Sequence, residues 1–87
     1  MNLSAKLLCA ISSTEPSTFP EILSGLNGDR PQEKSEFREF FETLRALEQS
    51  DLVEIEWGAN NRLNSAILTP LGAERAREAL KGQHNGF

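Results

Sequence analysis

The stretch LVEIEWGANNRLNSAILTPLG, from Leu52 to Gly72, decides the fold class of this chain. Its first part alternates apolar and acidic residues, which is the period-2 pattern of a strand with one buried face. The apolar positions are Val53, Ile55 and Trp57, and the acidic ones are Glu54 and Glu56. The letters GANN that follow supply residues that tolerate positive φ angles, which a hairpin tip needs. We therefore predict a β-hairpin with a polar tip.

The chain returns from this tip as a second strand, around Leu63 to Leu68. We expect Leu63, Ser65 and Ile67 to lie on one face of it. Thr69 next has a side chain that can cap a helix, and proline suits the first helical position because it lacks an N–H group. The pattern predicts a last helix that begins at Pro70 and ends near Gly82.

Helical periodicity predicts three helices ahead of the hairpin. The first follows the capping candidate Asn2 and should end around residues 12 and 13, and the second is capped by Thr18 and runs to Leu26. The third has the clearest apolar stripe. Its members are Phe37, Phe40, Phe41, Leu44 and Leu47. The expected class is α+β, in the order helix, helix, helix, strand, strand, helix.

Length and composition fit one small domain, which we place at residues 1–82, with a flexible tail at residues 83–87. The net charge of −4 disfavours a general polyanion binder. Neither a secretory leader nor a stretch of 18 apolar residues is visible, so we expect a cytoplasmic protein without a membrane anchor. The single cysteine, Cys9, lies within the apolar letters LLCAI and is expected to be a buried, reduced thiol.

Two segments, LRALEQSDLVEIEW and AILTPLGAERAREAL, resemble the winged-helix transcription regulators of the MarR and PadR type. In those families a helix that ends in a Leu-Glu pair leads to a Leu-Val strand, a wing, and a strand that enters Leu-Thr-Pro-x-Gly. Asp51 stands where the family often has glycine. The matching residues are Leu47, Glu48, Leu52, Val53, Leu68, Thr69, Pro70 and Gly72.

The resemblance implies a winged helix-turn-helix with a two-stranded wing, in which the third helix enters the major groove of double-stranded DNA and the wing reaches the backbone or minor groove. It also implies a homodimer. The DNA-binding residues expected on the third helix are Lys34, Ser35, Arg38, Glu39, Glu42 and Thr43. Those expected on the wing are Asn60, Asn61, Arg62 and Asn64, with Lys34 and Arg62 on phosphate.

The charge distribution keeps a second interpretation open. Between Glu33 and Glu56 eight acidic residues stand against three basic ones, and carboxylates repel phosphates. The alternative is a winged-helix interaction module that binds a basic protein partner, as an accessory or inhibitory factor would, for example one encoded by a phage or mobile element. Its docking face would consist of Glu39, Glu42, Glu54 and Glu56.

The sequence gives little support for an enzyme. Glu54 and Glu56 lie about 7 Å apart on one strand face, but nothing near them suggests a substrate pocket, so an exposed strand face is the simpler interpretation. His84 is the only histidine, and Cys9 has no histidine near it in sequence. We therefore expect no catalytic residues, no metal ligands and no cofactor.

Overall fold

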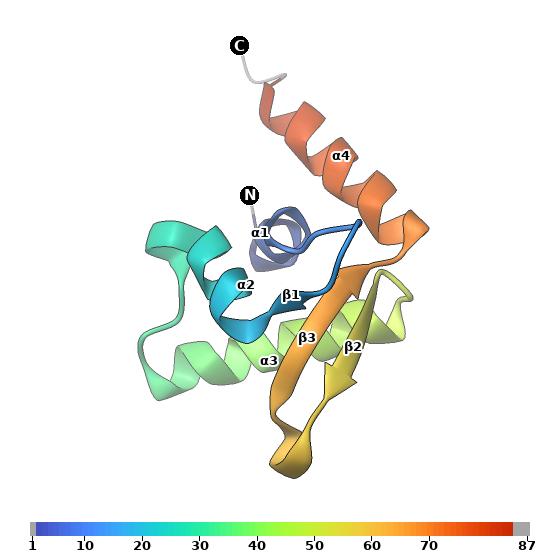
Figure 1. Ribbon diagram of the computed structural model, residues 1–87. Coiled ribbons are helices and arrows are strands. Elements are labelled where there is room, and N and C mark those ends of the chain that lie inside the picture. The colour runs from blue at the N-terminus through green and yellow to red at the C-terminus, as the bar shows by residue number, and fades with distance from the viewer. Residues whose placement is uncertain (1, 85–87) are drawn as a thin grey trace.

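The computed structural model describes residues 2–84, and within them the chain forms an α+β fold with a three-stranded antiparallel sheet (Figure 1). The elements follow one another as α1 (Leu3–Ala10), β1 (Ser17–Thr18), α2 (Phe19–Leu26), α3 (Lys34–Gln49), β2 (Val53–Trp57), β3 (Leu63–Leu68) and α4 (Pro70–His84). A 3-10 turn, η1 (Asn27–Asp29), follows α2. A second 3-10 turn, η2 (Ala59–Asn61), forms the tip of the hairpin between β2 and β3. The predicted tail falls partly on residues 85–87, which lie outside the described residues.

The predicted element order was incomplete, because a strand lies between the first two helices. β1 pairs antiparallel with β3, joining Ser17 to Ala66 and Thr18 to Ser65, so the sheet order is β1-β3-β2. Two residues are too few to show a period-2 pattern. The inward residue of β1, Ser17, is polar, so it also lacks the apolar signal of a buried strand position. Its Oγ accepts a hydrogen bond from the Ser12 N–H at 3.1 Å.

The predicted helix starts are confirmed by their capping contacts. The Asn2 side chain accepts a hydrogen bond from the Ala5 N–H at 2.9 Å at the start of α1. Thr18 and Glu21 form a reciprocal capping box on α2. α1 ends earlier than predicted, at Ala10, because Ile11 is already extended with φ −101° and ψ 134°.

The predicted inward face of the second hairpin strand was wrong. β3 buries Leu63, Ala66 and Leu68, whereas Ser65 and Ile67 are half-buried on the outer face. The register explains the difference, because Glu56 pairs with Ser65 but the next residue, Trp57, pairs with Leu63. The extra residue in β3 is a bulge, and it shifts every later side chain to the opposite face. Asn64 is that residue.

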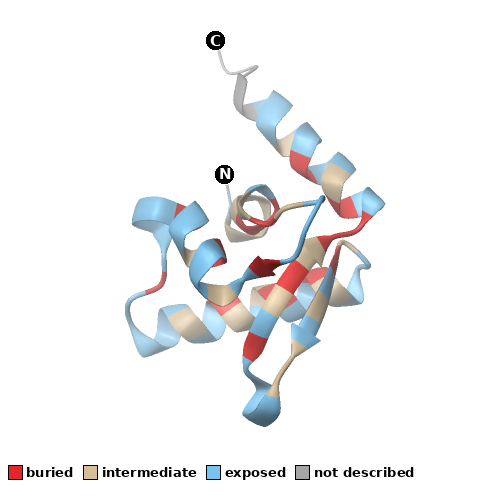
Figure 2. Cartoon of the chain, viewed as in Figure 1, coloured by how far each residue is buried: buried red, intermediate tan, exposed pale blue. Residues whose placement is uncertain are grey.

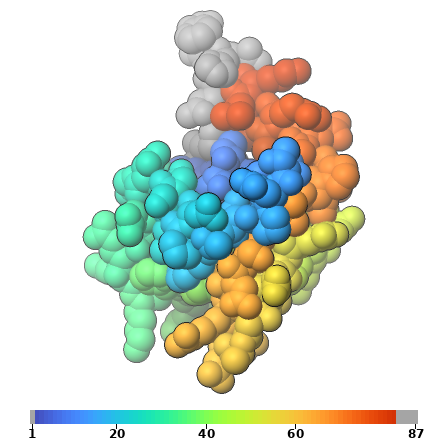
Figure 3. Space-filling model, in the orientation of Figure 1, coloured from blue at the N-terminus to red at the C-terminus, as the bar shows by residue number. Residues whose placement is uncertain are grey.

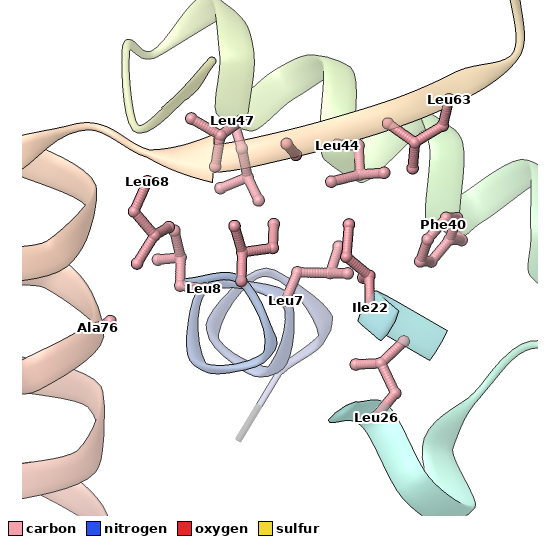
Figure 4. Packing of buried hydrophobic residues seen from close by; sticks show 13 residues of the cluster. Leu7, Leu8, Ile22, Leu26, Phe40, Leu44, Leu47, Leu63, Leu68 and Ala76 are labelled. Carbon is pink, nitrogen blue, oxygen red and sulfur yellow. The ribbon is translucent and has the colours of Figure 1, made fainter. Parts of the chain in front are cut away.

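The core lies between the inner face of the sheet and the helices α1, α2 and α3 (Figures 2 and 4). Leu7 and Leu8 of α1 point into it, opposite Leu44 and Leu47 of α3 (Figure 4). Of the predicted stripe on α3, Phe40, Leu44 and Leu47 are buried, while Phe37 and Phe41 are half-buried. α4 packs against α1 and β3, and its C-terminal part extends beyond the rest of the molecule (Figure 1).

Cys9 is exposed, so the prediction of a buried thiol was wrong. α1 turns Leu7, Leu8 and Ile11 toward the core, which leaves Cys9 on the flank that faces α4. Its Sγ lies 4.0 Å from the Ala76 carbonyl oxygen. Partial burial against α4 raises the pKa of the thiol above its ordinary value, which favours the unreactive protonated form.

The segment Thr69 to Gly72 joins α4 to the turn between α3 and β2. Thr69 Oγ1 donates to the Asp51 carbonyl oxygen at 2.6 Å and accepts from the Gly72 N–H at 3.0 Å, while the Thr69 N–H donates to the Leu52 carbonyl oxygen at 3.1 Å. Gly72 packs directly against the Leu52 carbonyl, where no side chain fits. The contacts of Thr69 and Gly72 with the turn between α3 and β2 therefore explain the Thr-Pro-x-Gly motif.

Candidate functional site

The hairpin of β2 and β3, which we call the wing, projects beyond the rest of the molecule on the side away from the end of α4 (Figure 3). The Gly58 N–H donates to the Arg62 carbonyl oxygen at 2.7 Å and closes the tip. Asn60 and Asn61 have φ angles of 59° and 58°, so the prediction of left-handed residues at the tip is confirmed. The turn leaves the Arg62 side chain exposed.

Asn64 lies on the wing as predicted, and its side chain also packs against the backbone of Gly58. A Cβ atom at Gly58 would lie 2.7 Å from Asn64 Oδ1 and 2.9 Å from Nδ2, so the Asn64 amide rests against the glycine backbone. This contact lies at the bulge, where the two strands separate toward the tip. Asn60, Asn61 and Arg62 are exposed beyond it. The tip of the hairpin is accordingly pale blue in Figure 2.

The predicted recognition residues of α3 are exposed with one exception. Lys34, Ser35, Arg38, Glu39 and Glu42 all face solvent. Thr43 is half-buried, and its hydroxyl donates to the Glu39 carbonyl oxygen at 2.7 Å, one turn earlier in the same helix. The Thr43 hydroxyl is therefore occupied within α3.

The exposed surface of α3 carries its charges in two zones. At about 100° per residue, Lys34, Arg45 and Arg38 fall within roughly 40° of one another. Glu42 follows about 40° further round the helix, and Glu39 about 60° beyond it. We call the first zone, together with Arg62 of the wing, the basic edge: Lys34, Arg38, Arg45 and Arg62.

Contacts with the hairpin show which zone faces the wing. The Arg45 guanidinium carbon lies 5.3 Å from the centre of the Trp57 ring, and Trp57 is the last residue of β2, next to the wing tip. Phe41, which neighbours Lys34 and Arg45 around the helix, lines a hollow together with Arg62, Leu63 and Asn64. The cations of α3 thus lie on the side next to the wing, and Glu39 lies on the side away from it.

Arg45 was counted only as a charge in the sequence and not as a site residue. The signal was present, because Lys34, Arg38 and Arg45 are spaced by four and seven residues, which places them on one side of a helix. The contact with Trp57 was not visible in the sequence. Trp57, which the sequence places on the apolar face of its strand, is half-buried at the end of β2 that leads into the tip.

The four glutamates proposed as one docking face do not come together. Glu54 and Glu56 point outward from β2, opposite Ile67 and Ser65 of β3, on the sheet face away from α3. Glu39 and Glu42 lie on the exposed side of α3. Since α3 packs against the inner face of the sheet, the two pairs occupy different surfaces.

The described part of the chain contains neither a group of metal ligands nor a membrane-spanning helix. Among residues 2–82, whose side chains the structure describes, no three His, Cys, Asp or Glu side chains are placed to hold a metal ion. None of the helices in that range combines the length and apolar composition that a membrane span requires. Among the same residues a single ion pair is formed, between Lys6 and Asp29 at 3.2 Å.

Comparison of the chain with protein-family models, with curated proteins and with solved structures finds no match.

Proposed function

We propose that this protein is a small winged-helix DNA-binding protein that acts as a transcriptional regulator. The arrangement of α2 and α3 as successive helices, followed by a hairpin that projects beside α3, supports a helix-turn-helix with a wing. The similarity of the Leu-Thr-Pro-x-Gly region to winged-helix regulators adds to this support. The homodimer remains a prediction that the mass of the protein in solution would test.

The observation that carries the proposal is the basic edge. The chain has a net charge of −4, yet Arg45 contacts Trp57 of the wing and Arg62 lies on the wing beside Phe41 of α3. The helical period places Lys34 and Arg38 on the same side of α3 as Arg45. Phosphate contacts depend on the local grouping of cations, and the net charge of a domain can hide such a group. An acidic protein with a basic edge is therefore compatible with binding DNA in one orientation.

In this orientation α3 lies along the major groove, and the wing follows the adjacent backbone. Lys34, Arg38 and Arg62 contact phosphates, while the amides of Asn60 and Asn61 donate to backbone oxygens or to base edges in the minor groove. Glu42 borders the basic edge and can accept a hydrogen bond from a cytosine amino group. Glu39 is turned furthest from the phosphates, which limits like-charge repulsion.

The experiment measures binding of a labelled random-sequence DNA duplex by fluorescence anisotropy for wild type, Arg62→Ala and Arg38→Ala. Each substitution should weaken binding about fivefold and lower the slope of log affinity against log salt by about 0.9, because one phosphate contact is lost. Arg75→Ala on α4 is the matched control, since it removes the same charge from an exposed helix that packs against α1 and β3. Equal losses in all three variants would contradict a localised interface.

A second candidate is a protein-interaction module that uses the acidic side of α3. Glu39 and Glu42 are exposed and form no ion pair among the described residues, so both charges are open to a basic partner. The double variant Glu39→Gln and Glu42→Gln separates the two functions. It should retain or strengthen DNA binding, whereas loss of a captured basic protein with unchanged DNA affinity would favour the interaction module.

A further inference from the structure

A shallow hollow separates the C-terminal half of α3 from the wing. Arg45, Glu48 and Gln49 of α3 line it on one side, and Trp57 and Asn61 of the wing line it on the other. It is distinct from the hollow beneath Arg62, which is lined by Phe19, Pro20 and Phe41 on the β3 side. The wing therefore has one hollow on each flank, and each contains an arginine.

Trp57 holds Arg45 in place within this hollow. The guanidinium carbon lies 5.3 Å from the ring centre, within the range of a cation–π contact. A guanidinium stacked on a ring keeps the N–H groups along its edge free to donate. Because the side chain is already ordered, less conformational entropy is lost when it binds a ligand.

Glu48 is the one group of this hollow that would repel an anion. Its Oε1 accepts a hydrogen bond from the Trp57 indole N–H at 3.4 Å, which holds the carboxylate beside the ring. Glu48 and Arg45 form no ion pair, since the one pair within 4.0 Å in the described residues joins Lys6 and Asp29. The guanidinium donors of Arg45 are thus not occupied by Glu48, whose carboxylate keeps its negative charge in the same hollow.

We propose that this hollow is a binding site for a backbone phosphate of double-stranded DNA. Arg45 supplies the charged donor, and the amides of Gln49 and Asn61 supply neutral donors from α3 and from the wing tip. The proposal rests on the proposed function and adds to it a phosphate site on the β2 flank of the wing. Arg62 on the β3 flank and Arg45 on the β2 flank then hold the DNA backbone from both sides.

Trp57 makes this site directly observable, because the chain has one tryptophan and no tyrosine. The 87-residue chain is titrated with random-sequence duplex DNA while Trp57 emission is recorded, and the same titration is followed by the anisotropy of labelled DNA. Since a phosphate bound to the stacked guanidinium changes the charge beside the ring, Trp57 emission should change with the same midpoint as the anisotropy curve. Arg45→Ala should bind about fivefold more weakly, with a salt slope smaller by about 0.9, and Arg45→Lys should restore the slope.

Arg75→Ala on α4 is the control and should match wild type in both readouts. Arg45 is exposed, so its removal leaves the core intact, and an unchanged melting temperature of Arg45→Ala verifies this. DNA binding with wild-type affinity and slope in Arg45→Ala, or binding that leaves Trp57 emission unchanged, would overturn this inference alone. Absence of DNA binding by wild type would overturn the proposed function as well.

Discussion

At the scale of single residues, Thr69 and Gly72 fix how α4 joins the rest of the fold. Thr69 bonds the Asp51 carbonyl and caps α4, and Gly72 lies against the Leu52 carbonyl. Asp51 itself has a φ of 62°, the left-handed conformation that glycine adopts most easily and that aspartate tolerates. Asp51 therefore adopts at modest cost a conformation that glycine would adopt freely.

Gly72→Ala should destabilise the protein by about 3 kcal/mol, because the added methyl group would collide with backbone that cannot move aside independently. Chemical denaturation measures the free energy of unfolding. Gly82→Ala lies on the same helix and meets nothing within 4 Å, so it should be neutral or slightly stabilising. Equal stability of the two variants would show that α4 is not docked as described.

Residue patterns predicted contacts that are local in sequence and missed those made at a distance. The cap at Thr69 and the asparagines of the tip follow from rules that involve neighbouring residues. Cys9 was misplaced because its exposure depends on which flank of α1 meets α4. Arg45 was overlooked because its partner, Trp57, lies twelve positions away on the wing.

At the scale of elements, α2 is held at its start by a reciprocal cap. The Thr18 N–H donates to Glu21 Oε1 at 2.8 Å, and the Glu21 N–H donates to Thr18 Oγ1 at 3.4 Å. The backbone hydrogen bond from Thr18, and then its side-chain bond, lower the pKa of the Glu21 carboxyl below its ordinary value. The charged form therefore stabilises the folded protein.

This lowered pKa predicts a specific pH dependence. The charged Glu21 carboxylate stabilises the folded protein fully above the pKa that glutamate has in the unfolded chain, about 4.3. This stabilisation is lost as the pH falls through the lower pKa of Glu21 in the folded protein. The melting-temperature difference between wild type and Glu21→Gln should shrink over this acidic range. Glu15→Gln, an exposed carboxyl in the preceding loop, is the control and should follow wild type. A constant difference for Glu21→Gln would contradict the cap.

Element prediction succeeded where the period was unbroken. The stripe on α3 and the alternation of β2 span enough residues to define a face, and both point as expected. The inward face of β3 was predicted wrongly because the bulge at Asn64 interrupts the alternation. A bulge is defined by the pairing of two strands, and the sequence of one strand does not show that pairing. β1 is too short to be recognised.

At the scale of the whole molecule, charge is separated more clearly than composition suggests. The basic edge lies between α3 and the wing, Glu39 lies on the far side of α3, and Glu54 and Glu56 lie on the outer sheet face. Regional charge totals make α3 acidic, because such totals ignore the direction of each side chain. Under the proposed function, DNA would lie on the side of the basic edge, and the glutamates of the outer sheet face would lie away from it.

The measurement that tests the central claim most directly is the affinity of wild-type protein for a random-sequence DNA duplex at about 50 mM and about 200 mM salt. Four cations on the basic edge predict micromolar or tighter binding at the lower concentration and a loss of roughly 100-fold at the higher one. Absence of binding at the lower salt concentration would contradict the account, because non-specific attraction to phosphate is strongest there.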